Sequence, residues 1–148
     1  MTYQLLFLCT GNYYRSRYAE ILFNTLAADM GLNWTATSRG LALEVGVNNV
    51  GPMYAVAIDR LQQQGITTAA YGRWPIQVQE CDLTHADLII ALDETEHRPY
   101  LTERFADWPD RVTYWGVHDL GFVPAQVALS KIDQEVRHLV QRLATSRD

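Results

Sequence analysis

Short apolar runs alternate with helical patterns along the chain, and this alternation restricts the fold more than any other feature. Residues 3–8 are almost continuously apolar, which is typical of a strand buried on both faces. Further strands are predicted at residues 34–38, 87–93 and 112–115. Strands that alternate with helices favour a parallel sheet. The sequence therefore predicts an α/β fold, a three-layer sandwich with a central four-stranded parallel sheet and helices on both faces.

Apolar residues spaced three and four apart predict the helices between these strands. The clearest pattern covers residues 19–30, directly after the first strand. Pro52 suits the first position of a helix and is expected to begin the second one. A polar helix is predicted as far as about residue 106, and a regular apolar stripe over 132–143 predicts the last helix. Residues 71–85 show too little periodicity to be assigned.

The chain has 148 residues, a usual length for one domain, and we expect a single domain over residues 1–148. Its 48% hydrophobic and 20% charged residues are ordinary for a globular protein. The apolar run nearest the N-terminus, residues 5–8, is too short for a signal peptide or a membrane span. Two cysteines, Cys9 and Cys81, are too few for a disulfide framework. We therefore expect a soluble cytoplasmic protein with free thiols.

Charge and residue counts exclude several classes of protein. The formal net charge of −5 repels nucleic acid. Lys131 is the only lysine, which argues against a Walker loop and against Schiff-base catalysis. No metal, other cofactor, nucleic-acid partner or membrane contact is expected. The histidines lack the spacing of metal ligands and are interpreted as surface or packing residues: His85, His97, His118 and His138.

In open parallel sheets, ligands bind beyond the carboxyl ends of the strands, in the loops that lead into helices. Three segments follow such strand ends: residues 9–16, 38–51 and 116–122. The first reads Cys-Thr-Gly-Asn-Tyr-Tyr-Arg-Ser and stands between a predicted strand and a predicted helix. The positive end of the helix dipole favours a thiolate at Cys9. A cysteine in this position is a candidate nucleophile.

The residues after Cys9 are suited to an anion cradle. If the loop curls, its inward-facing amides bind an anion, and Gly11 and Asn12 best tolerate the left-handed backbone that a curl requires. Arg15 offers a planar fork for two phosphate oxygens, and Ser16 is placed to donate to the Cys9 sulfur. The predicted substrate-binding residues are therefore the remaining members of this loop: Thr10, Gly11, Asn12, Tyr13, Tyr14 and Ser16.

This loop resembles that of the low-molecular-weight protein tyrosine phosphatase family, which has the form Cys-x-Gly-Asn-x-x-Arg-Ser. The resemblance extends over nearly the whole chain. Ala19-Glu20 follow the loop as is common in the family, and Ser38 resembles its second-strand serine, which supports the loop asparagine. Asp93 resembles the aspartate that trails the third strand, also expected to be a supporting residue. Asp119, after His118, stands where the family keeps its general acid.

The resemblance implies a metal-independent phosphatase that acts on phosphotyrosine in proteins or peptides. Cys9 would attack phosphorus and form a cysteinyl-phosphate intermediate, while Arg15 and the loop amides hold the phosphate oxygens. Asp119 would protonate the leaving group and then activate water, with His118 as a candidate to tune it. No cofactor is implied, and we expect a monomer or a weak dimer.

The sequence also departs from the family's pattern. Arg17 and Arg39 stand where other residues are usual. One hypothesis places both on the pocket rim, where they would favour acidic substrates, and the alternative is a pair of ordinary solvated charges. The general acid is followed by Leu-Gly-Phe, which alters the aromatic wall of the pocket. Phe122 and Leu43 are predicted as replacement wall residues, together with Tyr13. Cys81 is expected to be a small buried residue far from the site.

Three alternative functions remain. Arsenate reductases share the loop but use a further cysteine pair after the third strand, and no such pair occurs here. Protein-arginine phosphatases carry a threonine after the loop asparagine, whereas this chain has the bulky Tyr13. A phosphate-binding module without turnover would need neither Cys9 nor Asp119, so the presence of both favours an enzyme.

Overall fold

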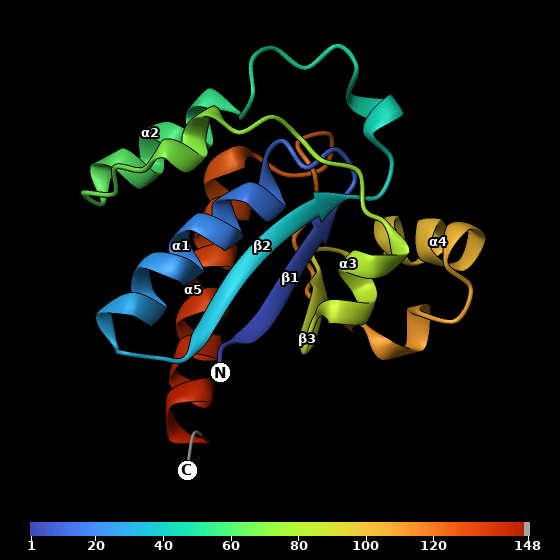
Figure 1. Ribbon diagram of the computed structural model, residues 1–148. Coiled ribbons are helices and arrows are strands. Elements are labelled where there is room, and N and C mark those ends of the chain that lie inside the picture. Colours follow the sequence, from blue (N-terminus) through green and yellow to red (C-terminus); the bar gives the residue numbers. More distant parts are fainter. Residues whose placement is uncertain (147–148) are drawn as a thin grey trace.

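The computed structural model describes residues 1–146 and is a three-layer α/β sandwich (Figure 1). Within these residues, a four-stranded sheet has the order β2-β1-β3-β4, and every adjacent pair is parallel. This confirms the predicted fold class. The strands are β1 (Tyr3–Cys9), β2 (Trp34–Gly40), β3 (Leu88–Ala91) and β4 (Thr113–Tyr114). The helices are α1 (Arg15–Asp29), α2 (Ala55–Gln63), α3 (Glu80–His85), α4 (Glu94–Arg104) and α5 (Ala125–Thr145).

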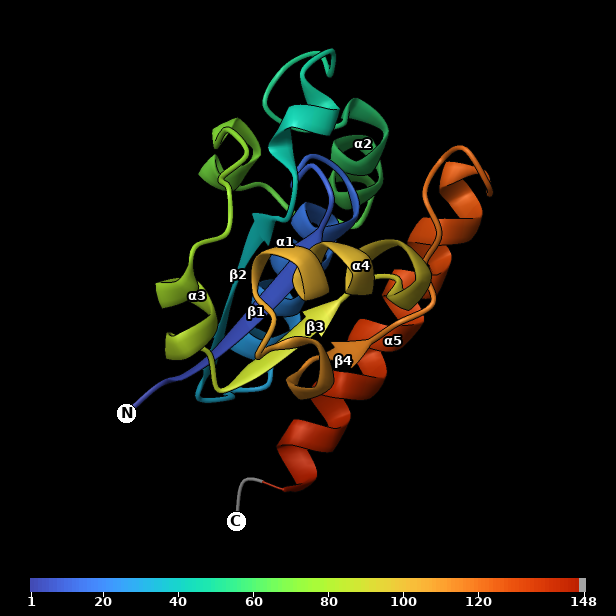
Figure 2. The same ribbon diagram turned by 90° about the vertical axis from the view of Figure 1, so that its right-hand side faces the viewer.

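Two apolar clusters hold the helices on opposite faces of the sheet. Alternate residues of β1 face in opposite directions, so Phe7 packs on one face against Phe23 of α1 and Trp115. On the other face, β1 and β3 pack against Leu83 of α3 and Leu101 of α4. Helices α1 and α5 therefore cover one face, and α3 and α4 cover the other (Figures 1 and 2). Burial on both faces explains why residues 3–8 are almost continuously apolar.

The second helix begins later than predicted. Helix α2 starts at Ala55 rather than Pro52, and Tyr54 before it has an extended backbone. The Tyr54 N–H donates to the Tyr13 carbonyl at 3.0 Å, and the Pro52 carbonyl accepts from Arg17 at 3.0 Å. These long-range bonds tie the segment to the loop after β1 and to α1, so the backbone groups of Tyr54 and Pro52 are satisfied outside a helix.

Three 3-10 turns complete the fold: Leu43–Gly46, Ala69–Gly72 and Pro109–Arg111. The first lies inside the predicted loop 41–51. The unassigned segment 71–85 contains the end of the second turn and α3, which is too short for a helical period to be visible in the sequence. Among the described residues, no helix combines the length and hydrophobicity needed to cross a membrane.

Candidate active site

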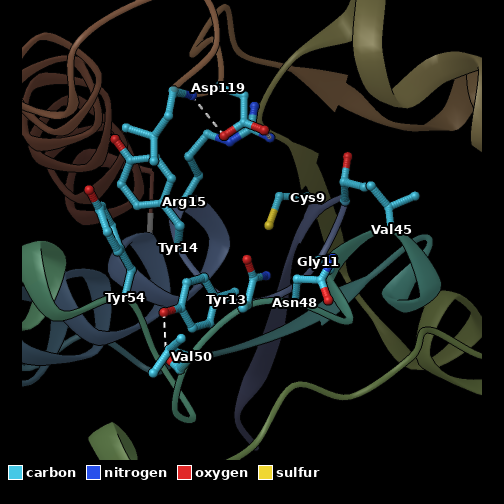
Figure 3. A pocket seen from close by; sticks show the side chains of 14 residues that line it. Cys9, Gly11, Tyr13, Tyr14, Arg15, Val45, Asn48, Val50, Tyr54 and Asp119 are labelled. Carbon is cyan, nitrogen blue, oxygen red and sulfur yellow. Dashed lines mark hydrogen bonds and ion pairs between the residues drawn. The ribbon is translucent and has the colours of Figure 1, made fainter.

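The carboxyl ends of the strands carry a pocket of about 400 Å³ (Figure 3). Three segments that are distant in sequence line it: the loop Cys9–Ser16, which we call the Cys9 loop, residues 45–50, and the loop 118–122, which we call the Asp119 loop. Tyr54 closes one side. All three segments predicted from the strand ends therefore contribute to one cavity.

The Cys9 sulfur lies at the base of this pocket and has a fixed hydrogen-bond partner. Cys9 ends β1 and is 3% exposed, and its Sγ lies 2.9 Å from Ser16 Oγ. Asn12 donates from Nδ2 to the same Ser16 oxygen at 2.9 Å, which leaves the Ser16 hydroxyl hydrogen available to the sulfur. A hydroxyl donor at this position, together with the N-terminus of α1, favours a thiolate.

Asn12 stabilises the curled backbone of the Cys9 loop. It is fully buried and has a φ of 53°, in the left-handed region that asparagine tolerates better than most residues. Its Oδ1 accepts from the Ile76 N–H at 3.0 Å and from Arg73 at 3.2 Å. Gly11 was expected to share the left-handed backbone, but it does not have a positive φ. Asn12 alone makes the turn, and its place is beneath the pocket rather than on its wall.

Ser38 at the end of β2 connects this loop to charged groups below it. Its hydroxyl accepts from Asn12 and from Arg73, both at 2.9 Å, and donates to Glu20 Oε1 at 2.7 Å. Arg73 also lies 3.3 Å from the Glu20 carboxylate. The contact between Ser38 and Asn12 fits the supporting role predicted for Ser38.

The Arg15 guanidinium lies beside the pocket and is held by α4 and the chain after β4. Arg15 is 2% exposed and donates to Glu96 at 3.0 and 2.7 Å and to the Val117 carbonyl at 2.9 Å. Burial would lower the pKa of Arg15, but the Glu96 hydrogen bond and the nearby Cys9 raise it above its ordinary value. Arg15 is therefore a cation that stays charged although it is almost fully buried.

The Asp119 carboxylate lies beside the Arg15 guanidinium at the edge of the pocket (Figure 3). Its Oδ2 lies 3.7 Å from the Arg15 NH2 group, and its side chain is 48% exposed. The Leu120 N–H donates to Asp119 Oδ1 at 2.8 Å. Asp93 does not reach Asp119. Its carboxylate instead contacts His118 Nδ1 at 2.9 Å, one residue before.

The sequence model of the low molecular weight phosphotyrosine protein phosphatase family matches residues 4–147, almost the entire chain. The chain belongs to this family. It is therefore a cysteine-dependent phosphatase, and the architecture around Cys9 agrees with that class of enzyme. No curated protein is significantly similar to the chain.

Solved structures of the family share the fold of this phosphatase over nearly its full length. A low molecular weight protein tyrosine phosphatase from T. tengcongensis is 26% identical, with a TM-score of 0.74 over 96% of this chain and 97% of that chain. Wzb from Vibrio vulnificus, bound to benzylphosphonate, is 19% identical, with a TM-score of 0.78 over 96% and 99%. The arginine phosphatase YwlE is 23% identical, with a TM-score of 0.73 over 96% and 93%.

The pocket walls of this phosphatase differ from the prediction. Leu43 does not line the pocket but packs over Gly40, and Phe122, which is 81% exposed, does not line it either. Tyr13 does line the pocket, as expected, but so do Tyr14 and Tyr54. Tyr14 and Tyr54 form an edge-to-face pair with centroids 5.0 Å apart, and burial raises the pKa of Tyr14 to about 12. The aromatic wall is thus formed by the Cys9 loop and the segment before α2.

The prediction that Arg17 and Arg39 lie on the rim is wrong. Arg17 is fully buried and donates to the carbonyls of Asn12, Pro52 and Ala70, at 3.3, 3.0 and 2.9 Å. Burial and, secondly, the charge of Arg73 lower its pKa to about 10. Arg39 leaves β2 in the other direction, toward Asp82 of α3 at 3.5 Å.

Cys81 was expected to be buried but is exposed, on α3. It is not among the residues that line the pocket. His97, by contrast, is completely buried, as expected of a packing histidine. The described residues contain no group of three or more histidine, cysteine and acidic side chains that would hold a metal ion.

Several residues that the structure brings to the site are missing from the sequence-based prediction, and the ones with the most specific contacts are Glu96, Arg73 and Tyr54. A signal existed for Glu96, because it lies in the first turn after β3, and β3 pairs with β1 directly below the Cys9 loop. Arg73 lies in a segment without periodicity, and Tyr54 lies before a helix whose start was misplaced, so no comparable signal pointed to them.

Proposed function

We propose that this phosphatase hydrolyses phosphotyrosine in proteins through a cysteinyl-phosphate intermediate. The observation that carries the proposal is the convergence of the Cys9 thiol, the Arg15 guanidinium and the Asp119 carboxylate on one pocket. These groups supply a nucleophile, an anion receptor and a proton donor, which are the functions that phosphomonoester hydrolysis requires. Binding of phosphate alone would need only the second of them.

In the first step, Cys9 Sγ attacks phosphorus in line with the bond to the leaving oxygen. The S–P bond forms while the P–O bond breaks, and Asp119 in its acid form transfers its proton to the departing oxygen. Arg15 and the amides of the Cys9 loop bind the equatorial oxygens, where they stabilise the transition-state charge. Positioned donors fill the role that a metal ion has in other phosphatases.

In the second step, water releases the phosphate. Asp119, now ionised, accepts a proton from water, whose oxygen attacks phosphorus. The P–S bond breaks and its electron pair returns to Cys9 as the thiolate, which the Ser16 hydroxyl stabilises. Inorganic phosphate leaves, and Asp119 is again protonated for the next cycle.

The tyrosines around the pocket support an aryl phosphate as the substrate. Tyr13, Tyr14 and Tyr54 line it, and aromatic rings pack well in offset or edge-to-face contact with a phenyl ring. The related Wzb structure holds benzylphosphonate, also an aromatic phosphorus acid. The arginine phosphatase YwlE has the same fold, so phosphoarginine is the alternative substrate to be tested.

We expect a reducing compartment, the cytoplasm, as the place of action, because the nucleophile must remain a free thiol. The partner is a phosphorylated protein, and the enzyme is expected to be a monomer or a weak dimer. Sedimentation of the purified protein at micromolar concentration checks the oligomeric state.

The decisive experiment compares Cys9→Ser with Cys81→Ser in hydrolysis of p-nitrophenyl phosphate without metal. Cys81 is exposed and lies outside the pocket, so it is a matched control for the loss of a thiol. We expect Cys9→Ser to abolish turnover and Cys81→Ser to retain it. Turnover that persists in Cys9→Ser contradicts the proposal.

Substrate choice is tested with two peptides of the same sequence, one carrying phosphotyrosine and the other phosphoarginine. We expect a higher kcat/KM for the phosphotyrosine peptide. Tyr54→Ala should reduce kcat/KM for this peptide by about tenfold, since an aromatic contact with its packing contributes about 1.5 kcal/mol. A preference for phosphoarginine would assign the enzyme to the alternative function.

A further inference from the structure

A partly buried carboxylate on α4 connects the two ends of the Cys9 loop. Glu96 stands in the first turn of α4, and its side chain is 22% exposed. Its Oε1 accepts from Arg15 NH1 at 3.0 Å, and its Oε2 accepts from Arg15 NH2 at 2.7 Å. The Thr10 hydroxyl also donates to Oε2. Thr10 and Arg15 are five residues apart in the loop, so one side chain fixes both.

The surroundings of Glu96 keep it ionised. Burial would raise its pKa, but the contacts with His97 and Arg15 lower the pKa well below its ordinary value. His97 Nδ1 accepts from the Asp93 N–H at 3.1 Å, so the ring proton of the neutral imidazole is on Nε2, 3.1 Å from Glu96 Oε2. The N-terminal turn of α4 adds a positive dipole end.

The hydrogen bonds of Arg15 leave one edge of its guanidinium unused. NH1 donates to Glu96 and to the Val117 carbonyl, which uses both of its N–H groups. NH2 gives one N–H to Glu96. Within residues 1–146, these bonds use neither the Nε–H nor the second N–H of NH2. The Asp119 carboxylate lies 3.7 Å from NH2, as an ion-pair partner beyond hydrogen-bond distance. The two unused N–H groups point in parallel from the same edge, which is the geometry that binds two oxygens of a phosphate.

We propose that Glu96 is a positioning residue that selects this edge of Arg15 for the phosphate. By occupying the end formed by NH1 and NH2, the carboxylate prevents rotation of the guanidinium and leaves the Nε–NH2 edge for the substrate. The inference rests on the proposed function, because it concerns the binding of the same phosphate. It adds a residue that acts on the substrate only through Arg15.

The positioning role predicts the direction in which phosphate affinity changes when the charge of Glu96 is removed. A negative charge close to an anion site should weaken phosphate binding by Coulomb repulsion, so its removal should strengthen binding. A positioning role predicts the opposite, because a guanidinium without its anchor loses the fixed geometry of two charge-assisted bonds. The direction of the change in phosphate affinity therefore distinguishes the two roles.

The test measures binding of inorganic phosphate to the Cys9→Ser protein by calorimetry or ³¹P NMR, with and without Glu96→Gln. We expect the Kd to rise about tenfold or more, the loss of about 1.4 kcal/mol. Glu94→Gln is the matched control, because Glu94 lies on the same turn but pairs with exposed Arg98 at 3.0 Å. An unchanged or tighter Kd in Glu96→Gln overturns the proposal.

A second variant retains the charge and moves it. Glu96→Asp keeps the carboxylate but shortens the side chain by one methylene, so it no longer reaches both Arg15 nitrogens. We expect its phosphate affinity and its kcat/KM in the Cys9-containing enzyme to fall about tenfold, with thermal unfolding as a check on the fold. Wild-type phosphate affinity in Glu96→Asp would contradict a positioning role. If phosphate fails to bind even when Glu96 is intact, the proposed function fails instead.

Discussion

The Cys9 loop and the Asp119 loop face each other across one pocket, but they are held in different ways. In the Cys9 loop, Asn12 and Ser16 are fully buried and bonded to each other, and Asn12 is further bonded to distant Ser38 and Arg73. The Asp119 loop is mostly exposed. Its backbone N–H groups at Leu120 and Phe122 bond locally to Asp119, and its long-range contacts are made by the exposed side chains of His118, with Asp93, and Asp119, with Arg15.

This difference corresponds to two tasks. Binding of a phosphate transition state gains most from donors that are fixed in advance, because their reorganisation would cost free energy during the reaction. Transfer of a proton to a leaving group needs only a group of suitable acidity within reach. We infer that the buried network of the Cys9 loop serves to bind the charged phosphate, and that the exposed Asp119 loop adapts to the substrate.

The largest expected effect distinguishes the role of the Asp119 loop from that of the Cys9 loop. Asp119→Asn should lower kcat by about 10²–10⁴-fold for phenyl phosphate, whose poor leaving group needs the proton, while the Kd of inorganic phosphate changes little. The loss should be smaller for p-nitrophenyl phosphate, whose leaving group is more acidic. Steady-state kinetics on both esters check this. An equal loss for both esters would contradict the assignment of Asp119 as the acid.

A smaller effect is expected from Ser38→Ala in the network beneath the Cys9 loop. The substitution leaves Asn12 Nδ2 and the Glu20 carboxylate each without one hydrogen-bond partner, at a cost of about 1–3 kcal/mol in the free energy of unfolding. Urea unfolding measures it. Ser130→Ala removes an exposed hydroxyl that also accepts from an arginine, and should cost less than about 0.5 kcal/mol. Similar losses for both variants would show that the network contributes little.

The buried side of the pocket should also affect stability at high pH. Burial raises the pKa of Tyr14 to about 12, whereas the unfolded chain releases this proton near pH 10. The unfolded state then binds fewer protons, so the stabilisation is fully present below pH 10 and is lost as the pH rises toward 12. Urea unfolding of Tyr14→Phe at pH 9 and pH 11 should show a smaller decrease than the wild type. Equal decreases would be inconsistent with this pKa.

The smallest effect is expected on the open side. Phe122 is 81% exposed and lies outside the pocket, so Phe122→Ala should change kcat/KM for a phosphotyrosine peptide by less than about twofold, within the range of a neutral surface substitution. The loss of kcat/KM in Tyr54→Ala, measured in the same assay, shows how large the effect is for a residue of the pocket wall. A tenfold loss in Phe122→Ala would show that the Asp119 loop closes over the substrate.

Much of the architecture was predictable because its causes are local. The apolar run at residues 3–8 and the helical stripe after it fix a strand, a tight loop and a helix, and the alternation of such units favours a parallel sheet. The curl of the Cys9 loop depends on Asn12, whose left-handed backbone is a property of that residue type. The contact between Cys9 and Ser16 also lies within one strand–loop–helix unit.

The errors concern side chains whose environment is set by distant segments. Arg17 was expected on the pocket rim from its place just after the Cys9 loop, but it is buried, and three carbonyls from separate parts of the chain accept from its NH1 and NH2 groups. Phe122 was expected in the pocket because it is aromatic, but Tyr54 takes that place through its backbone bond to Tyr13.

The sequence by itself determined the fold class, the position of the Cys9 loop and the presence of a cysteine and an arginine within it. The tertiary structure alone decided which edge of Arg15 is free, through Glu96, and how Asn12 is held, through Arg73. Glu96 is 81 residues from Arg15, and Arg73 is 61 residues from Asn12. Periodicity and propensity act over a few residues, whereas these ion pairs and hydrogen bonds form only where the sheet brings remote loops together.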